Sequence, residues 1–453
     1  WLILLLFDSV PAALLTGLLF GIHPLHVESV AWITERKDVL YSVFFLASLV
    51  SYAFYCRKKR TAFYVLSLVL FIASALSKPS AVVLAPVAVL IDYVLHRPPD
   101  RKTVLEKLPF FVIAFIFGAA SLFTKHPAGA ADHSFTVFYS TYSVLFYLEK
   151  LLVPSGLSSF YPYPDPRNGL PFSYLISPFI LVCLAASLFF ITGERARKVR
   201  FGALFFAVTI LPAAVIMLVP SCRIITADRY DYIPSIGILY LVSGAVVLCY
   251  RKLGAHSRLL QRSVVVAASC AVVTLSVQTW QRCRIWHDDM TLWNDALSKY
   301  ANAAIPLCNR GIAYCISGDL EKALADFEKA VAANPRLAEA HYSMGNIYMQ
   351  LGQYGRSIEA FSRAIAIDPG LARAYNNRGY VYSLEKDFKH AVSDYDRALA
   401  VDKNYSKVYY NRGMAYFQEK EYGRAWDDLQ KAMQLNYRVD PAILAALEKN
   451  RGR

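Results

Sequence analysis

Three short segments of this 453-residue chain concentrate side chains that can do chemistry. The first is His-Pro-Leu-His-Val-Glu at 23–28, closely followed by Glu-Arg-Lys-Asp at 35–38. The second is Lys78-Pro79, and the third runs from Arg223 to Asp231. Carboxylates of this kind can take a proton from a hydroxyl group, and clustered cations can hold an anion such as a phosphate. The residue types therefore predict a site for an anionic ligand.

Long apolar segments must position these residues. Such runs dominate residues 1–280, and each is long enough, or nearly so, to cross a bilayer as a helix. The pattern Asp8-Ser9-Val10-Pro11 indicates a break between two helices inside the first run. This pattern excludes a plain soluble enzyme, and the 56% of hydrophobic residues exclude a disordered chain. The apolar runs lie at about 1–22, 38–56, 61–77, 79–95, 108–124, 137–153, 175–192, 201–219, 232–250 and 263–280.

The charge distribution predicts an orientation in the membrane. Residues 1–280 carry 24 Lys and Arg against 13 Asp and Glu, and residues 281–453 carry 24 against 21. Most of the excess lies in four short loops, which the positive-inside rule places in the cytoplasm. We expect no nucleic-acid binding, because a nucleic-acid-binding protein would gather its positive charge on a soluble face. The four basic clusters are Arg57–Arg60, Arg97–Lys107, Arg195–Arg200 and Arg251–Arg262.

One run, 137–153, is less apolar than the others and contains Glu149-Lys150. If it crossed the membrane, the third basic cluster would fall outside the cytoplasm. We therefore predict a non-spanning helix within an outer region at 125–174, about nine spans in total, and an ordered Tyr- and Pro-rich loop at 160–174 over the site. Everything after residue 281 then lies outside the cytoplasm, and the three chemical segments open on that same side.

The second half of the chain has a 34-residue period. Gly311, Gly345, Gly379 and Gly413 recur at this spacing, and a Tyr follows each by three positions. The period and its Gly, Ala and aromatic positions are typical of the tetratricopeptide repeat, a pair of antiparallel helices that stacks into a solenoid. We expect four repeats over 304–439, a capping helix at 440–453, and a linker with one helix at 281–303.

The first helices of these repeats carry a set of polar side chains that would line the concave surface. An Asn side chain offers both a donor and an acceptor to an extended peptide backbone. The sequence thus predicts a peptide groove, although the same residues would also suit an exposed, solvated face. The groove residues are Asn309, Tyr342, Asn346, Asn376, Asn377, Tyr410 and Asn411.

Together these features predict an all-α fold, a polytopic membrane helical bundle followed by a tetratricopeptide α-solenoid. The motifs at 23–32 and 35–38, Lys78-Pro79, Tyr161-Pro162 and Ala-Asp-Arg-Tyr-x-Tyr-x-Pro-Ser-x-Gly at 227–237 occur together ahead of the repeats. This combination resembles the transmembrane and tetratricopeptide-repeat-containing O-mannosyltransferases, and most closely their bacterial relatives. The resemblance implies a bundle of the glycosyltransferase C type, a polyprenyl-phosphate sugar donor, and transfer of the sugar to Ser or Thr hydroxyls of an acceptor protein held by the repeats.

The resemblance also suggests roles for single residues. His23, His26, Arg36, Lys78, Arg223 and Arg229 are candidates for binding the donor phosphate, and Glu28, Glu35, Asp38 and Asp228 are candidates for acid or orienting roles. The family's main acid lies on the first outer loop, which we expect upstream of Trp1, so the chain is interpreted as a fragment that lacks its general base. The family also implies repeats in the periplasm of a bacterial cytoplasmic membrane, or in the lumen of the endoplasmic reticulum.

Several simpler interpretations stay open. The acids and histidines would also suit a structural network at the membrane edge. Lys78 would also suit the role of a side chain that only reaches to the membrane interface, and Asp228-Arg229 would also suit a local ion pair. No cofactor is expected and the cysteines lack metal-ligand spacing, although His-x-x-His-x-Glu at 23–28 leaves a divalent metal open. As a whole, the chain would alternatively be a non-catalytic membrane scaffold whose repeats recruit other proteins.

Overall fold

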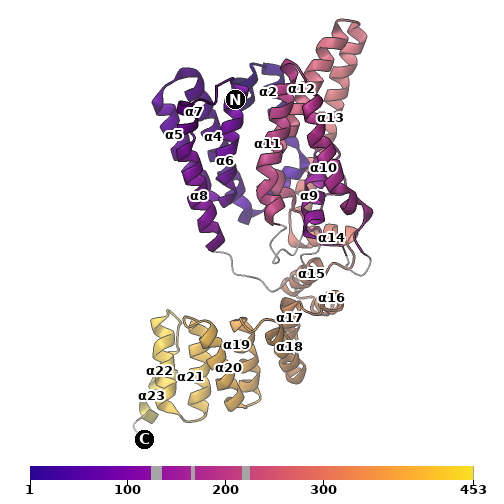
Figure 1. Ribbon diagram of the computed structural model, residues 1–453. Coiled ribbons are helices and arrows are strands. Elements are labelled where there is room, and N and C mark those ends of the chain that lie inside the picture. The colour runs from indigo at the N-terminus through magenta and orange to yellow at the C-terminus, as the bar shows by residue number, and fades with distance from the viewer. Residues whose placement is uncertain (124–134, 165–168, 217–224, 452–453) are drawn as a thin grey trace. The chain divides into compact units, whose positions relative to one another are not determined.

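A computed structural model describes residues 1–123, 135–164, 169–216 and 225–451 (Figure 1). Over these residues the chain forms helices and connecting segments, and a lone antiparallel bridge joins Tyr161 to Thr226. The predicted all-α fold class is confirmed. The chain divides into two compact units, Trp1–Leu292 and Trp293–Arg453.

The first unit is a bundle of helices that run back and forth along a common direction (Figure 1). As predicted, the first apolar run is broken at Asp8, which takes the left-handed conformation at φ 50°, and Pro11 lies at the start of the following helix. The α-helices are α1 (Leu2–Phe7), α2 (Val10–Ile22), α3 (Val27–Ala31), α4 (Arg36–Lys58), α5 (Thr61–Ser77), α6 (Leu84–Val94), α7 (Arg101–Leu105), α8 (Leu108–Phe123), α9 (Thr136–Leu152), α10 (Phe172–Phe190), α11 (Glu194–Ile216), α12 (Ser235–Gly254) and α13 (Arg258–Ile285). Short 3₁₀ helices are η1 (Pro24–His26), η2 (Ile33–Glu35), η3 (Pro79–Val83) and η5 (Asp228–Asp231).

Six helices of the described chain are long and apolar enough to cross a membrane, or up to seven if the bent pair Val10–Ile22 and Pro24–Ala31 counts as one span. Two further apolar helices, Thr61–Ser77 and Pro79–Val94, are shorter. The helix α9 has 17 residues and does not belong to either group. The expected number of nine spans, and the domain limits drawn from the sequence, stay predictions.

The core of the bundle lies where α4, α5, α6, α8 and α11 meet. Its largest fully buried side chains include Phe45, Tyr52, Phe71, Phe110 and Phe205. By contrast, α10 and α13 expose many apolar side chains, as helices that face lipid would. The interior is therefore aromatic and close-packed, and it fixes the helix ends that carry the polar residues.

The basic clusters gather at one end of this unit. Arg57, at the end of α4, pairs with Asp8 at 3.0 Å, and Tyr55 on the same helix donates to Glu106 at 2.7 Å. Arg97 in turn pairs with Glu106 at 2.6 Å. The helices α4, α11 and α12 connect this end to the opposite one (Figure 1). Arg36 and Ser235 are the first residues of α4 and α12 at that opposite end, and Asp231 ends η5 shortly before α12. The bundle thus has a basic end and an end that carries the predicted chemical segments.

The second unit is a row of helix pairs. Its helices are α14 (Asp289–Lys299, which begins at the end of the first unit), α15 (Ala304–Ser317), α16 (Leu320–Ala333), α17 (Ala338–Gln350), α18 (Tyr354–Ile367), α19 (Ala372–Leu384), α20 (Phe388–Val401), α21 (Ser406–Gln418), α22 (Tyr422–Gln434) and α23 (Pro441–Arg451). Within a pair the helices approach closely: a Cβ at Gly345 would lie 2.7 Å from the ring of Phe361. Glycine at this position is what allows the aromatic ring to fill the space between two helices.

A ladder of Arg–Asp pairs joins the two helices of three repeats. Arg378 donates two hydrogen bonds to Asp394, each 2.7 Å long. Arg310 with Asp326 and Arg412 with Asp428 repeat this two-pronged geometry. In the second repeat Met344 and Ala360 stand at the equivalent positions. Each Asp is buried, so the Arg both fixes the helix pair and neutralises a carboxylate inside it.

Candidate functional site

A small pocket opens between the start of α4, the start of η3, the η5 segment and the end of α11. Lys78 enters it from the extended residue that ends α5, and Asp38 enters it from the first turn of α4. Arg229, Tyr230 and Tyr232 come from the η5 segment, and Thr209 and Pro212 from α11. Residues that lie far apart in the sequence thus meet at the end opposite the basic clusters.

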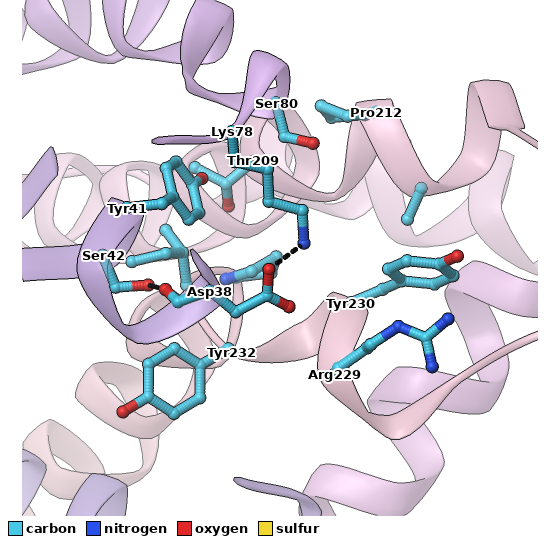
Figure 2. Close-up of a pocket in the computed structure, with 13 residues that line it drawn as sticks. Asp38, Tyr41, Ser42, Lys78, Ser80, Thr209, Pro212, Arg229, Tyr230 and Tyr232 are labelled. Atoms are coloured by element: carbon cyan, nitrogen blue, oxygen red, sulfur yellow. Dashed lines mark hydrogen bonds and ion pairs between the residues drawn. The ribbon is translucent and has the colours of Figure 1, made fainter. Parts of the chain in front are cut away.

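Lys78 and Asp38 form the central ion pair of the pocket. The Lys78 Nζ lies 2.6 Å from the Asp38 Oδ1 (Figure 2). The Asp38 carboxylate is buried, whereas 17% of the Lys78 side chain is exposed. The Lys78 ammonium also lies 6.0 Å from the centre of the Tyr41 ring and 5.8 Å from that of Tyr230, within reach of cation–π attraction. The pair therefore leaves a partly accessible cation at the pocket wall.

Arg229 is the second cation of the pocket. Its guanidinium pairs with Glu28 and lies 3.6 Å from Glu35, and its backbone N–H donates to Glu28 at 3.2 Å. It also lies over the rings of Trp32 and Tyr230, at 5.2 and 5.0 Å from their centres. Burial alone would lower the pKa of Arg229, but the two carboxylates outweigh it and raise that pKa. Arg229 is thus a permanent cation with a fixed orientation.

A second buried cluster lies next to Arg229 in the chain. Asp228 accepts a hydrogen bond from the Tyr161 hydroxyl at 2.8 Å and lies 3.6 Å from the Arg282 guanidinium. Asp231 is completely buried, and neither of its carboxylate oxygens has a hydrogen-bond partner in the described chain. Burial, reinforced by the charge of Asp228, raises the pKa of Asp231 well above its usual range. The buried site therefore favours the protonated form of the Asp231 carboxyl.

The structure does not bring every candidate to the pocket. His23 donates from Nε2 to the Leu151 carbonyl at 3.1 Å, and His26 from Nδ1 to the Phe20 carbonyl at 2.7 Å. Both rings are buried and anchor backbone segments. Arg36 is exposed at the start of α4 and does not line the pocket, and Arg223 falls outside the described residues.

All four candidate acids contact cations: Glu28 and Glu35 contact Arg229, Asp38 contacts Lys78, and Asp228 contacts Arg282. Sequence reasoning missed Arg282, which lies at the end of α13, and the part of Tyr230 and Trp32 as ring partners of the cations. The sequence contained a signal for these two aromatic residues. Tyr230 lies in the same motif as Arg229, and Trp32 lies in the same motif as Glu28.

The pocket is narrow. Its free volume is about 30 Å³, and a water molecule needs roughly 10–15 Å³ by the same kind of measure. The space holds a few water molecules but no sugar phosphate, so a phosphate could reach Lys78 only by displacing Asp38 or by widening the pocket. No group of three or more His, Cys, Asp or Glu side chains suited to a metal ion occurs in the described ranges.

The predicted groove residues of the repeats are linked to one another. Asn377 donates to Asn346 at 2.8 Å and to the Tyr342 hydroxyl at 3.1 Å. Asn411 donates to Asn376 at 2.9 Å, and Asn376 to Asn377 at 2.9 Å. These contacts form an amide ladder that crosses three repeats. Tyr410 instead packs on Tyr437, with 4.9 Å between ring centres, and Asn309 is half-buried on α15.

The fold and the period together define a helical-bundle protein with a tetratricopeptide-repeat arm. Family models described as TPR repeat and tetratricopeptide repeat match residues 311–352, 345–385, 372–405 and 406–438. Among curated proteins, the chain is similar to Protein O-mannosyl-transferase F38B6.6 of Caenorhabditis elegans, with 27% identity over 303 residues. The match covers 63% of this chain and 41% of that protein, so the chain spans about two fifths of the relative's length. The predicted resemblance to tetratricopeptide-repeat-containing O-mannosyltransferases is thereby confirmed, whereas the greater similarity to their bacterial relatives stays a prediction.

Solved structures are similar to about a third of this chain. MamA from Desulfovibrio magneticus RS-1 is 23% identical, with a TM-score of 0.32, over 34% of this chain and 90% of that chain. YrrB, described as a TPR protein with an unusual peptide-binding site, is 21% identical with a TM-score of 0.31, over 35% of this chain and 81% of that chain.

Proposed function

We propose that this chain is a membrane glycosyltransferase-like protein that binds a polyprenyl-phosphate sugar and transfers the sugar to protein Ser or Thr hydroxyls. The observation that carries the proposal is the meeting of Lys78 and Arg229 in one pocket at the end of the bundle away from the basic clusters. A leaving phosphate gains negative charge as the glycosidic bond breaks, and fixed cations stabilise that charge. The similarity to a protein O-mannosyl-transferase supports this class of reaction.

In this proposal the Asp38 carboxylate occupies the place that the donor phosphate takes beside Lys78. Arg229 keeps its position through Glu28 and Glu35 and adds a second positive charge. The four acids already neutralise cations, which favours orienting roles for them over the role of proton acceptor. The repeats would hold the acceptor protein, with the amide ladder contacting its backbone.

The test is donor binding by the protein in lipid nanodiscs, measured with a fluorescent polyprenyl-phosphate mannose. Asp38→Asn should retain or strengthen binding, because it frees Lys78. The double variant Lys78→Gln/Asp38→Asn, which removes both charges together, should weaken binding at least tenfold, since a charge-assisted hydrogen bond contributes about 1.5–3 kcal/mol. Arg57→Gln, at the basic end, is the matched control. Equal binding by the double variant and by Asp38→Asn would exclude this pocket as the donor site.

Transfer itself is measured in the full-length protein with Ser- and Thr-containing peptides. Arg229→Lys keeps the charge but loses the forked geometry, and it should reduce turnover less than Arg229→Gln. The proposed orientation, with the repeats in the periplasm or lumen, is tested in a cysteine-free background. Cysteines placed at Lys58 and Ser317 should react with an impermeant reagent from opposite sides of the membrane.

A second function, a non-catalytic scaffold, is favoured by one observation: all four candidate acids are engaged by cations. This alternative predicts that peptides bind to the repeats while the donor does not bind to the bundle. The donor-binding measurement above separates the two functions.

A further inference from the structure

A second and much larger cavity lies at the basic end of the bundle. Its free volume is about 480 Å³, which falls in the range of roughly 300–1,000 Å³ typical of sites that enclose small ligands. It is bounded by the junction of α1 and α2, the first turns of α11 and the part of α12 from Tyr240 to Arg251. The pocket at Lys78 is at the other end of these helices, so the two sites are separate.

The walls of this cavity combine apolar side chains with three cations. Phe7, Ala12, Tyr240, Leu241, Ala245 and Leu248 contribute apolar surface, and the Phe7 and Tyr240 rings stack at 4.5 Å. Arg195, Lys198 and Arg251 supply the cations, and no Asp or Glu occurs among the lining residues. We call this cavity the basic groove.

Some basic residues at this end are engaged by partners. Arg57 pairs with Asp8, Arg97 with Asp92 and Glu106, and Arg200 donates to the carbonyls of Leu188 and Ile191. For Arg195, Lys198 and Arg251 the described chain provides no ion pair. Three cations that line one apolar cavity and have no ion-pair partner among the described residues repel one another, and they favour an anion that lies between them.

We propose that the basic groove binds one anionic phospholipid, its phosphate between Arg195, Lys198 and Arg251 and one acyl chain along α12. The proposal rests on the membrane placement given above, but not on the glycosyl-transfer reaction. A soluble anion would leave the apolar walls without a partner, whereas an acyl chain gains from contact with them. Basic pockets between membrane helices on the cytoplasmic side suit anionic headgroups, and the basic clusters place the groove on that side.

A glycine gives a test that leaves the charges in place. A Cβ at Gly244 would meet no atom within 4 Å, although Gly244 lines the groove. Gly244→Leu therefore fills the space for the acyl chain, and leucine suits a helix better than glycine does. Gly17 on α2 is equally open and does not line the groove, so Gly17→Leu is the matched control.

The experiment measures lipids retained by the purified, delipidated protein in native mass spectrometry, during titration with phosphatidylglycerol or phosphatidylcholine. We expect the protein to hold one phosphatidylglycerol tightly and to bind phosphatidylcholine with lower affinity. The triple variant Arg195→Gln/Lys198→Gln/Arg251→Gln should weaken this binding at least tenfold, because each cation near a lipid surface contributes about fivefold. Gly244→Leu should also weaken it at least about tenfold, because the new side chain fills the space of the acyl chain. Gly17→Leu and Arg57→Gln should bind like the wild type.

Three results would overturn the proposal. Wild-type binding by Gly244→Leu would place the lipid elsewhere. Equal affinity for phosphatidylcholine would remove the role of the negative charge. Displacement of the lipid by inorganic phosphate at equal concentration would indicate a site for a free anion. None of these results depends on sugar transfer, so the proposed function and this proposal can fail separately.

Discussion

Lys78 and Arg229 lie against the same aromatic ring, that of Tyr230: the Lys78 Nζ is 5.8 Å and the Arg229 Cζ 5.0 Å from its centre. Two cations that share one ring repel each other unless acids compensate them. The compensating acids, Asp38 and Glu28, come from a single stretch of chain near the start of α4. The pocket is therefore held together by opposite charges from different segments, and its stability depends on their balance.

The first prediction concerns the balance between Lys78 and Asp38. Lys78→Met leaves the buried Asp38 without its cation and should lower the free energy of unfolding by about 3 kcal/mol, the scale found when one partner of a buried pair is removed. Lys78→Met/Asp38→Asn leaves neither charge and should recover most of that loss. Unfolding midpoints of the two variants in detergent measure the difference. Equal midpoints would show that an unpaired charge on the buried Asp38 does not destabilise the fold.

The second prediction concerns the pH dependence set by Asp231. Because its pKa is raised in the folded protein, the folded state binds a proton that the unfolded state releases above pH 3.8, the ordinary value. The stability that this proton contributes is complete at low pH and is lost as the pH rises toward the folded-state pKa, by about 1.4 kcal/mol per pH unit.

Asp231→Asn, which resembles the protonated carboxyl, should abolish that dependence. The unfolding midpoint of the wild type should therefore fall more steeply than that of Asp231→Asn as the pH rises above 3.8. Glu149→Gln, an exposed change on α9, controls for the general effect of removing an acid. Parallel curves for the wild type and Asp231→Asn would mean that Asp231 is ionised in the fold.

The third prediction uses the natural difference between the repeats. Arg378→Met leaves Asp394 buried and unpaired and should destabilise the third repeat by about 3 kcal/mol. Arg378→Met/Asp394→Ala reproduces the residues of the second repeat, Met344 and Ala360, and should cost much less. Hydrogen exchange of α19 and α20 in the full chain gives the local stability. If both variants exchanged alike, the ion pair would have no part in holding the two helices together.

Much of the architecture could be predicted from the sequence, because long apolar runs and a fixed 34-residue period are strong signals. Pro11 predicts the helix break at Asp8. Basic residues such as Arg57 predict that the basic clusters and the segments with candidate site residues lie at opposite ends of the bundle. The charged residues of the pocket could be predicted as site residues because ionisable residues beside apolar runs are rare. Lys78, Asp38 and Arg229 were found in this way.

The partners of these residues could not be predicted, because they depend on how helices pack. The pairing of Asp38 with Lys78 requires α4 and α5 to lie side by side. The histidines at 23 and 26 suited a phosphate by type, but their rings face backbone carbonyls at Leu151 and Phe20. Sequence position cannot indicate the direction of a ring. The Arg–Asp ladder appears in the sequence only as an Arg directly before the glycine of three repeats. In the second repeat Met344 takes this place, so the pattern is not continuous.

The fourth prediction concerns the amide ladder of the repeats. Asn377 donates to Asn346 and to Tyr342, so it links the second and third repeats. Asn377→Ala should weaken the binding of an extended, fluorescein-labelled Ser/Thr peptide about tenfold, as the loss of one or two hydrogen bonds implies. The unfolding midpoint should change little, since a net intramolecular hydrogen bond contributes only about 1 kcal/mol.

The control for this prediction is Asn404→Ala, at an exposed turn outside the ladder. A purely structural ladder gives the opposite pattern, with a lower unfolding midpoint for Asn377→Ala and wild-type affinity for the peptide. Because the two roles move different measurements, binding and unfolding data on the same two variants decide whether the asparagines hold a peptide or only hold one another.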